Sequence, residues 1–299
     1  MSHAWMSHAC VGPHVHVNPA SNSSPRPSTR LTRSRDRVAL SLPRRKLDAC
    51  SGRGWPTANE SWIKFRAAID ECSAKRGFPM VLSVESCDDP DGCGQWVGGL
   101  ANLWRTCGDI QATFASVMGN VAENTKMAAL AGPTGGPLGG GHWNDADMLQ
   151  VGDIGLSLTE QRSHFSLWCL MASPMLMGTD VSMLSNTSLS IMGNKEACAI
   201  NQDVLGKQGV PVGPGSDDAH TAPCWAKPLA NGDVAVLLLN TGDGTVTISC
   251  ALSDLGLPDG AKMATDIWSG KEMGAMGKGS SIKTDLKSHD VLFLRVTKA

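Results

Sequence analysis

The sequence predicts an α/β region followed by an antiparallel β-sandwich. From residue 46 to about residue 210, compact apolar runs of the kind found in buried parallel strands alternate with helical patterns. Beyond residue 221, short runs alternate between apolar and polar residues and are separated by glycine-containing turns, as an antiparallel sandwich requires. A polar, glycine-rich stretch lies between them at 213–221. We therefore expect one domain over 46–215 and a second over 219–299.

Composition limits the classes of partner. The chain has 299 residues and is 41% hydrophobic, which is enough for one large or two ordinary domains with a real core. Its net charge of −2 gives no electrostatic footprint for nucleic acid, and no apolar run of about 18 residues is present to span a membrane. The ten cysteines lack the paired spacing of a zinc site, so we expect no metal. Cys87 and Cys93 are close enough to bridge, although two free thiols fit the spacing equally well.

Residues 1–45 differ in composition from the rest of the chain. They contain seven arginines against one acidic residue, Asp36, and show no apolar periodicity. Such a segment cannot bury a core, and it has no apolar region of the kind that a secretory signal contains. We expect it to be disordered, or to be a start that does not belong to the natural gene.

The α/β region begins with a helix and a buried strand. Thr57–Glu60 is a capping-box pattern, after which apolar residues recur at helical intervals until Gly77. Phe78–Glu85 is a buried-type strand that ends in a carboxylate. Leu103–Ile110 is a further strand, followed by a helix to about Glu123. Later elements are a helix from Glu160 to Met171 and a last strand over 175–180.

The most informative stretch is Gly139–Leu149, in which a glycine run leads into Trp-Asn-Asp-Ala-Asp. On a strand, Trp143, Asp145 and Asp147 point to one side, so two carboxylates can converge on one ligand. The alternative is a solvated turn rich in aspartate.

The sequence around this stretch resembles the glycoside hydrolases of family 27. These are the melibiase-type α-galactosidases and their α-N-acetylgalactosaminidase relatives. The similarity continues through 155–206, with the segments Glu160–Trp168, Ala172–Gly178 and Asn194–Gly206. The resemblance implies a (β/α)8 barrel followed by a C-terminal β-sandwich. It also implies a retaining glycosidase that needs neither a metal nor an organic cofactor, and whose partner is a carbohydrate substrate.

Two short segments carry the catalytic residues that the resemblance implies. Lys46–Cys50 resembles the family's Lys-Tyr-Asp-Asn-Cys strand end, which makes Asp48 the expected nucleophile and Lys46 and Cys50 expected sugar contacts. Leu103–Ile110 resembles the family's Trp-Arg-x-x-x-Asp-Ile segment. There an arginine binds sugar and an aspartate is the general acid and base, which corresponds to Arg105 and Asp109.

Three further residues match family positions that contact sugar. Glu85 matches a glutamate that binds sugar hydroxyls, and Asp147 with Met148 matches the contacts at the following strand. Asp145 is expected to form structural hydrogen bonds instead.

The resemblance covers only residues 46–299, which correspond to barrel strands four to eight. One βαβ unit takes about 30 residues, so 1–45 are too few for the three units that precede these strands in the family. Two hypotheses follow: an α-galactosidase impaired by the absence of strands one to three, or a non-catalytic remnant that at most binds sugar or a partner. The resemblance does not decide between galactose and N-acetylgalactosamine as the substrate sugar. It is also compatible with a homodimer. It also suggests a secretory, lysosomal, vacuolar or extracellular route, which sequons at Asn59 and Asn186 permit.

Overall fold

The computed structural model describes residues 44–47, 58–85, 92–137, 140–257, 262–277 and 279–297. The expectations for the N-terminal segment up to residue 43 therefore lie outside the described residues. The helices are α1 (Ala58–Arg76), α2 (Gly94–Leu100), α3 (Phe114–Lys126), α4 (Leu158–Leu170), α5 (Asn186–Met192) and α6 (Lys195–Asn201). The strands are β1 (Arg44–Leu47), β2 (Val81–Val84), β3 (Leu103–Arg105), β4 (Trp143–Asp145), β5 (Val210–Pro211), β6 (Cys224–Pro228), β7 (Val234–Leu239), β8 (Val246–Ala251), β9 (Lys262–Asp266), β10 (Glu272–Met276), β11 (Ser281–Leu286) and β12 (Val291–Thr297).

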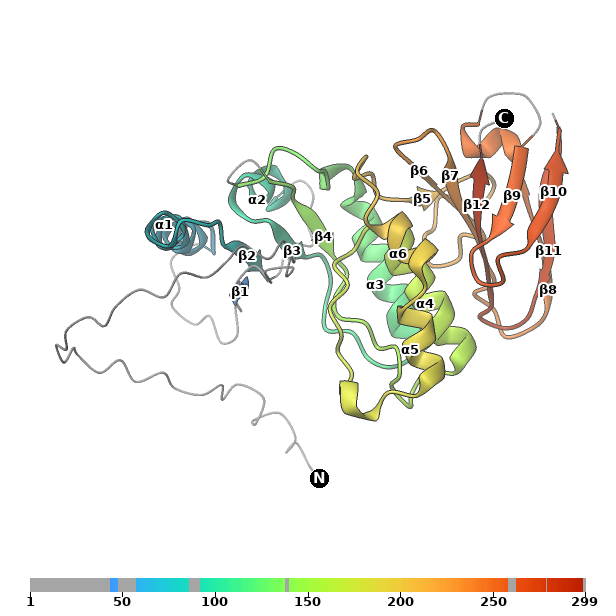
Figure 1. Ribbon diagram of the computed structural model, residues 1–299, viewed down its shortest axis with the longest axis horizontal. Helices are drawn as coiled ribbons and strands as arrows, with labels where there is room; N and C mark the ends of the chain where they lie inside the picture. The colour runs from blue at the N-terminus through green and yellow to red at the C-terminus, as the bar shows by residue number, and fades with distance from the viewer. Residues whose placement is uncertain are drawn as a thin grey trace, which may run out of the picture. The chain divides into compact units, whose positions relative to one another are not determined.

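The first sheet is parallel, with the strand order β1-β2-β3-β4, and its strands alternate with helices (Figure 1). This is part of a (β/α)8 barrel, as predicted. The predicted fifth strand over 175–180 is reduced to one parallel bridge between Leu149 and Met177. Leu176 accepts from the Leu149 amide and the Gly178 amide donates back to Leu149, and pairing stops there. Pro174, which has no amide hydrogen to donate, precedes this short contact.

The predicted helix after residue 57 is α1, and Gly77 ends it with a φ of +74°. Only part of the apolar pattern of this helix is buried. Trp62 and Ile69 are buried on β2 and α2, whereas Phe65 and Cys72 are exposed. Helix α2, which was not predicted, is short and glycine-rich, so its sequence carries little helical signal.

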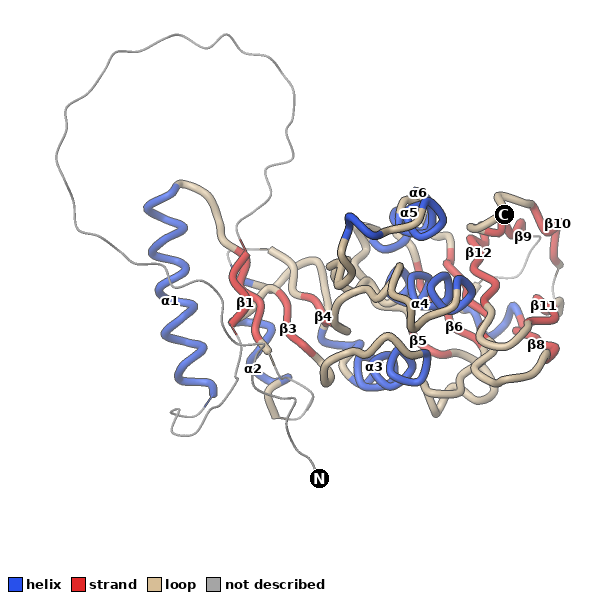
Figure 2. Tube along the Cα trace, turned by 90° about the horizontal axis from the view of Figure 1, so that it is seen from below, coloured by secondary structure: helices blue, strands red, loops and turns tan. Residues whose placement is uncertain are grey.

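Helix α4 is the most deeply buried helix element described. Ser157 and Glu160 form a capping box at its first turn, and the residues from Ser163 to Leu170 are all buried. It contacts α3, α5 and α6 on one side and strands β7 and β12 on the other. In Figures 1 and 2 these helices lie between the parallel sheet and the antiparallel strands. The buried residues of α4 include the polar Gln161, Ser163, His164 and Ser166, whose side chains form hydrogen bonds inside the protein, so its sequence shows no single apolar stripe.

The C-terminal region is the predicted sandwich. A six-stranded sheet of order β10-β9-β12-β7-β6-β5 packs on a two-stranded sheet of β11 and β8. Every residue of β7 is buried because its sheet is covered on both faces. Ala235 and Leu237 face the helix layer, whereas Val236 and Leu238 face the two-stranded sheet. Strand β10, which was not predicted, is an exposed edge strand whose Glu-Met-Gly-Ala-Met sequence has little β propensity.

A lysine is fully buried where this sheet meets α4. Lys227 on β6 has no exposed surface, and its Nζ donates to the carbonyl of Cys169 at 3.4 Å, in the last turn of α4. A cation there satisfies one of the carbonyls that a helix end leaves open. Burial lowers the pKa of Lys227 to about 8, although the nearby Cys169 and Asp203 side chains act in the opposite direction.

The folded-state pKa of Lys227 lies below its ordinary value of 10.5, so the unfolded chain binds a proton more tightly. The free energy of unfolding should therefore rise as the pH increases from about 8 to about 10.5, by on the order of 3 kcal/mol. Lys227→Met, which has a similar volume, should abolish this rise. Urea unfolding of both proteins across this pH range, followed by tryptophan fluorescence, measures the difference.

Lys283→Met is the matched control, because Lys283 is exposed on β11. Its unfolding profile should keep the rise seen in the parent protein. An identical pH profile for the Lys227→Met variant and the parent would contradict this account of the buried ammonium.

Candidate functional site

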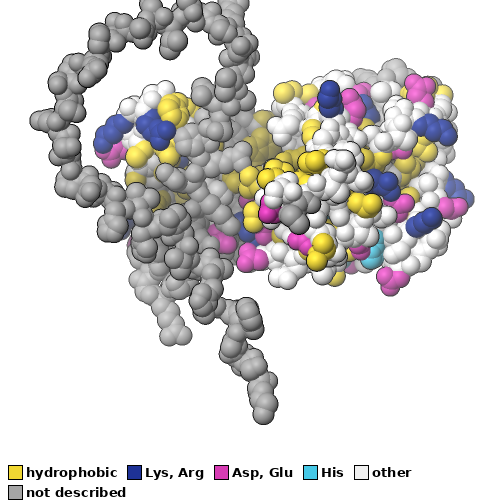
Figure 3. Space-filling view, turned by 60° about the horizontal axis from the view of Figure 1, so that its bottom comes forward, with side chains coloured by type: hydrophobic (Ala, Val, Ile, Leu, Met, Phe, Trp, Pro, Cys, Tyr) yellow, Lys and Arg dark blue, Asp and Glu magenta, His cyan; other side chains and the backbone are white. Residues whose placement is uncertain are grey.

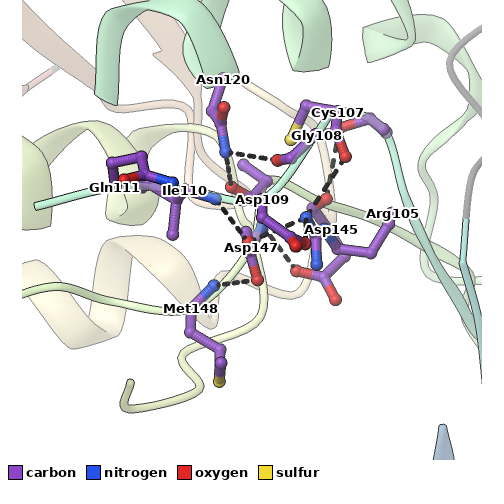
Figure 4. Close-up of polar contacts among 12 residues, drawn as sticks. Arg105, Cys107, Gly108, Asp109, Ile110, Gln111, Asn120, Asp145, Asp147 and Met148 are labelled. Carbon is purple, nitrogen blue, oxygen red and sulfur yellow. Dashed lines mark hydrogen bonds and ion pairs between the residues drawn. The ribbon is translucent and has the colours of Figure 1, made fainter. Parts of the chain in front are cut away.

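A buried arginine lies at the carboxyl end of β3. Arg105 is the last residue of the strand, and its side chain is 2% exposed. One guanidinium nitrogen, Nη2, lies 2.8 Å from Oδ2 of Asp147 and 3.1 Å from Oδ1 of Asp109 (Figure 4). The same nitrogen donates to the carbonyl of Cys107 at 3.3 Å. Two carboxylates from separate loops thus meet at one cation.

Burial acts to lower the pKa of Arg105, because a charged group is disfavoured away from water. The charge of Asp147 raises the pKa, and Cys107, Asp109 and Asp145 raise it further. The net result is a raised pKa for Arg105. Arg105 is therefore charged at every relevant pH. Cys107 is partly buried beside it, and burial raises the pKa of its thiol to about 11, so this cysteine is a neutral neighbour at physiological pH.

Asp147 has an unusual backbone. Its φ is +81°, in the left-handed region that residues other than glycine rarely adopt. Its amide donates to Oδ1 of Asp145 at 2.9 Å, which confirms Asp145 as a structural hydrogen-bonding residue. Its own carboxylate accepts from the amides of Ile110 and Met148 at 2.9 and 2.8 Å. Strained residues that are held this firmly cluster at functional sites.

The strand alternation expected for Gly139–Leu149 therefore ends at Asp145. Strand β4 stops there, and the positive φ at Asp147 turns the chain so that its carboxylate reaches Arg105 across the end of the sheet. The two carboxylates of this segment remain in one hydrogen-bonded group, but a turn brings them together and not a continuous strand.

Helix α4 holds the backbone of Asp147 in place through a hydrogen bond. The indole Nε1 of Trp168 donates to the Asp147 carbonyl at 2.8 Å, and this bond is buried. His164 lies against the edge of the Trp168 ring, with 4.1 Å between ring centroids, and its Nε2 accepts from the Gln150 amide at 3.0 Å. Both residues are fully buried, and no sequence pattern indicated that they hold the loop at Asp147.

An asparagine joins the two loops of the site. Nδ2 of Asn120 on α3 donates to the carbonyls of Gly108 and Ala146 at 3.3 and 3.1 Å. The amide of Ala146 donates in turn to Ser173 Oγ at 3.1 Å. No sequence motif indicated Asn120 or Ser173, since each acts through the backbone of a residue far away in the chain.

The predicted site residues fall into three groups. Asp109, Arg105 and Asp147 come together, and the Asp109 side chain is 82% exposed and thus open to a ligand. Glu85 directly follows β2, at the same end of the sheet, and Met148 beside Asp147 is 42% exposed. Lys46 lies on β1, at a position where only the backbone is described, and Asp48 and Cys50 lie outside the described residues.

A cavity of about 730 Å³ lies elsewhere in the parallel-sheet region. It is lined by residues at the opposite, amino-terminal ends of β2, β3 and β4, among them Val81, Leu103 and Trp143. In folds of this kind, chemistry is performed at the carboxyl ends of the strands. We therefore assign the candidate site to the Arg105 group and not to this cavity.

Two negative findings apply to the described residues. Among them, no three histidine, cysteine, aspartate or glutamate side chains are grouped as a metal site. No helix there has the combined length and hydrophobicity that crossing a bilayer needs. Acidic and basic side chains are interspersed on the face drawn in Figure 3.

Comparison with known protein families shows to which family the chain belongs. Residues 40–203 match the family model described as alpha galactosidase A, and residues 219–296 match the alpha galactosidase C-terminal beta sandwich domain. The chain belongs to the alpha-galactosidase family. The first match contains the whole Arg105 group, and the limits of the second lie inside the predicted sandwich domain.

Individual relatives agree with this. The chain is 40% identical over 196 residues to an alpha-galactosidase of Oryza sativa subsp. japonica, a match that covers 65% of this chain and 44% of the rice protein. It is 34% identical over 224 residues to alpha-galactosidase 2 of Arabidopsis thaliana, covering 75% of this chain and 52% of the relative. The chain thus spans about half the length of these curated relatives. Alpha-galactosidase I from Mortierella vinacea superposes with a TM-score of 0.73 at 26% identity, covering 86% of this chain and 68% of that structure.

Full burial of His164 leads to a prediction about acid. Burial lowers its pKa to about 3, from an ordinary value of 6.5, so the unfolded chain takes up the proton first as the pH falls. The free energy of unfolding should therefore decrease as the pH falls from about 6.5 to about 3, by on the order of 4 kcal/mol. His164→Gln keeps an acceptor for the Gln150 amide but does not titrate, so its decrease should be clearly smaller.

The measurement is the urea midpoint of both proteins at pH 7, 5.5 and 4. His220→Gln is the control, because His220 is exposed in a turn. Equal acid sensitivity of the His164→Gln variant and the parent would show that another group is responsible.

Proposed function

We propose that this chain is the C-terminal part of a retaining exo-glycosidase that removes terminal α-linked galactose from oligosaccharides or glycoconjugates. The observation that carries the proposal is the Arg105 group: an exposed aspartate and a buried, strained aspartate share one arginine at the carboxyl ends of parallel strands. Membership of the alpha-galactosidase family supports the assignment of roles.

In the proposed reaction, the carboxylate of Asp48 attacks the anomeric carbon while Asp109 protonates the leaving glycosidic oxygen. Asp109 then removes a proton from the water that hydrolyses the glycosyl-enzyme intermediate. This requires the two carboxyl groups to lie about 5 to 5.5 Å apart. Asp109 fits its role because its side chain is open to solvent while Arg105 fixes one of its oxygens.

The remaining residues would bind the sugar. Arg105 and Asp147 are held rigidly, and a preorganised charged pair can make hydrogen bonds to sugar hydroxyls without losing side-chain entropy. Glu85 and Met148 would add contacts from the neighbouring loops. Lys46 on β1 and Cys50, which follows β1 in the sequence, would do so as well. Whether the sugar is galactose or N-acetylgalactosamine depends on the loop after Glu85, part of which lies outside the described residues.

The second candidate is a non-catalytic remnant with at most sugar-binding or partner-binding ability. The chain aligns with 44% of the rice protein, and the test below separates the two candidates. In the family barrel, strands one to three also contact the sugar. Each such contact would contribute about 1.5 to 3 kcal/mol, so losing them would lower the rate by many powers of ten.

The two candidates predict different activities. We expect the 299-residue chain alone to hydrolyse an aryl α-galactoside feebly or not at all. Joined to the N-terminal barrel units of the rice relative, it should become active. In that chimera Asp109→Asn should lower kcat by roughly a hundredfold or more, because proton transfer to the leaving oxygen is lost.

Asp217→Asn is the matched control, since Asp217 is an exposed aspartate in the turn between the two regions. It should leave kcat unchanged. A folded chimera without activity would favour the remnant, and an Asp109→Asn chimera with full activity would refute the role assigned to Asp109.

A further inference from the structure

Two free cysteines face each other inside the sandwich. Cys224 is the first residue of β6, in the six-stranded sheet, and Cys250 lies on β8, in the two-stranded sheet. Both are buried, with 4% and 1% exposure, and both belong to the hydrophobic core between the two sheets. They come from different sheets, so a bond between them would join the two layers covalently.

The two sheets are close at this point. Sγ of Cys224 lies 3.7 Å from the carbonyl of Ser249, which is the backbone neighbour of Cys250 on β8. The Cys250 thiol acts to lower the pKa of Cys224, and Cys224 acts to raise the pKa of Cys250, as expected for two thiols that lie close together. Both side chains belong to the same core cluster between the sheets, and Cys224 already contacts the backbone of β8.

We propose that Cys224 and Cys250 are a covalent modification site at which an inter-sheet disulfide forms when the chain meets a small-molecule disulfide such as oxidised glutathione. The thiolate of Cys224 attacks one sulfur of the reagent and expels one thiolate, giving a mixed disulfide. Cys250 then loses its proton and attacks Sγ of Cys224, which expels the second thiolate. Two cysteine thiols are oxidised, one disulfide reagent is reduced to two thiols, and the two protons go to the released thiolates.

Burial determines when this reaction occurs. Neither sulfur is reachable in the closed sandwich, so exchange takes place during folding or when the two-stranded sheet opens. Strands β8 and β11 pair only with each other among the described strands, and this sheet can therefore separate without breaking the ladder of the larger sheet. Once formed, the disulfide would prevent that opening and would link residues 224 and 250 in the unfolded chain.

The other free cysteines provide an internal comparison. Cys72 is exposed on α1, and Cys107 lies at the candidate site. Cys93 is already disulfide-bonded, and Cys87, the partner that the sequence offered for it, lies outside the described residues. Cys169 and Cys198 are also free: Cys169 is buried in α4, and Sγ of Cys198 donates to the carbonyl of Met192 at 3.5 Å.

The test uses the 299-residue chain refolded in oxidised glutathione or in a dithiol reductant. Each sample is unfolded, alkylated, digested and analysed by mass spectrometry. We expect a cross-linked peptide pair containing Cys224 and Cys250 in the oxidised sample alone, two hydrogen atoms lighter than the separate peptides. Proteolysis of the sandwich under native conditions should be at least about tenfold slower in the oxidised sample.

Cys224→Ala and Cys250→Ala should each abolish both the cross-link and the difference in proteolysis, whereas Cys72→Ala should leave both unchanged. The comparison of oxidised and reduced parent protein needs no variant, so a variant that fails to fold does not weaken it. If both cysteines of the oxidised parent are fully alkylated after unfolding, the proposal is wrong. Equal proteolysis of a cross-linked and a reduced sample would also overturn the proposed effect on sheet opening.

Discussion

The burial of the Arg105 guanidinium is the constraint on which the candidate site depends. A charge at this depth is tolerated only when carboxylates and carbonyls satisfy it. Asp147 supplies the closest carboxylate, and it reaches Arg105 only because its φ is +81°. The amides of Ile110 and Met148 hold the other lone pairs of that carboxylate. Strain in one residue is thus balanced by five polar contacts, because Trp168 and Asp145 also bind its backbone.

Helix α4 connects this site to the sandwich. Trp168 reaches Asp147 near one end of the helix, while at the other end Glu160 pairs with His289 and Arg162 with Asp290 in the turn before β12. The turn residue His289 itself has a φ of +56°, which these contacts help to stabilise. The sandwich is therefore more than an appended domain, because the helix that holds it also fixes the backbone under the strained aspartate.

The sequence was sufficient to predict elements whose signal is local. Periodicity located α1, α4 and the main sandwich strands, and the family resemblance indicated Arg105, Asp109 and Asp147 as residues of one site, where the structure brings them together. The features that could not be predicted depend on contacts between residues that are far apart in the sequence. Asn120 carries no motif yet bridges two loops, and β10 became a strand only because β9 offered an open edge. A positive φ at a non-glycine residue likewise has no sequence signature.

The parts of the proposed active site differ in how their geometry is fixed. Strand β3, which carries Arg105, has a hydrogen-bonded neighbour on each side, whereas β1, which leads to Asp48, pairs with β2 alone among the described strands. A strand paired on one side is held less firmly than one in the middle of a sheet. The Arg105 group can therefore keep its arrangement whatever completes the sheet beyond β1. The position of Asp48, the proposed nucleophile, depends on that completion, so loss of the proposed catalysis and loss of the Arg105 geometry are separable events.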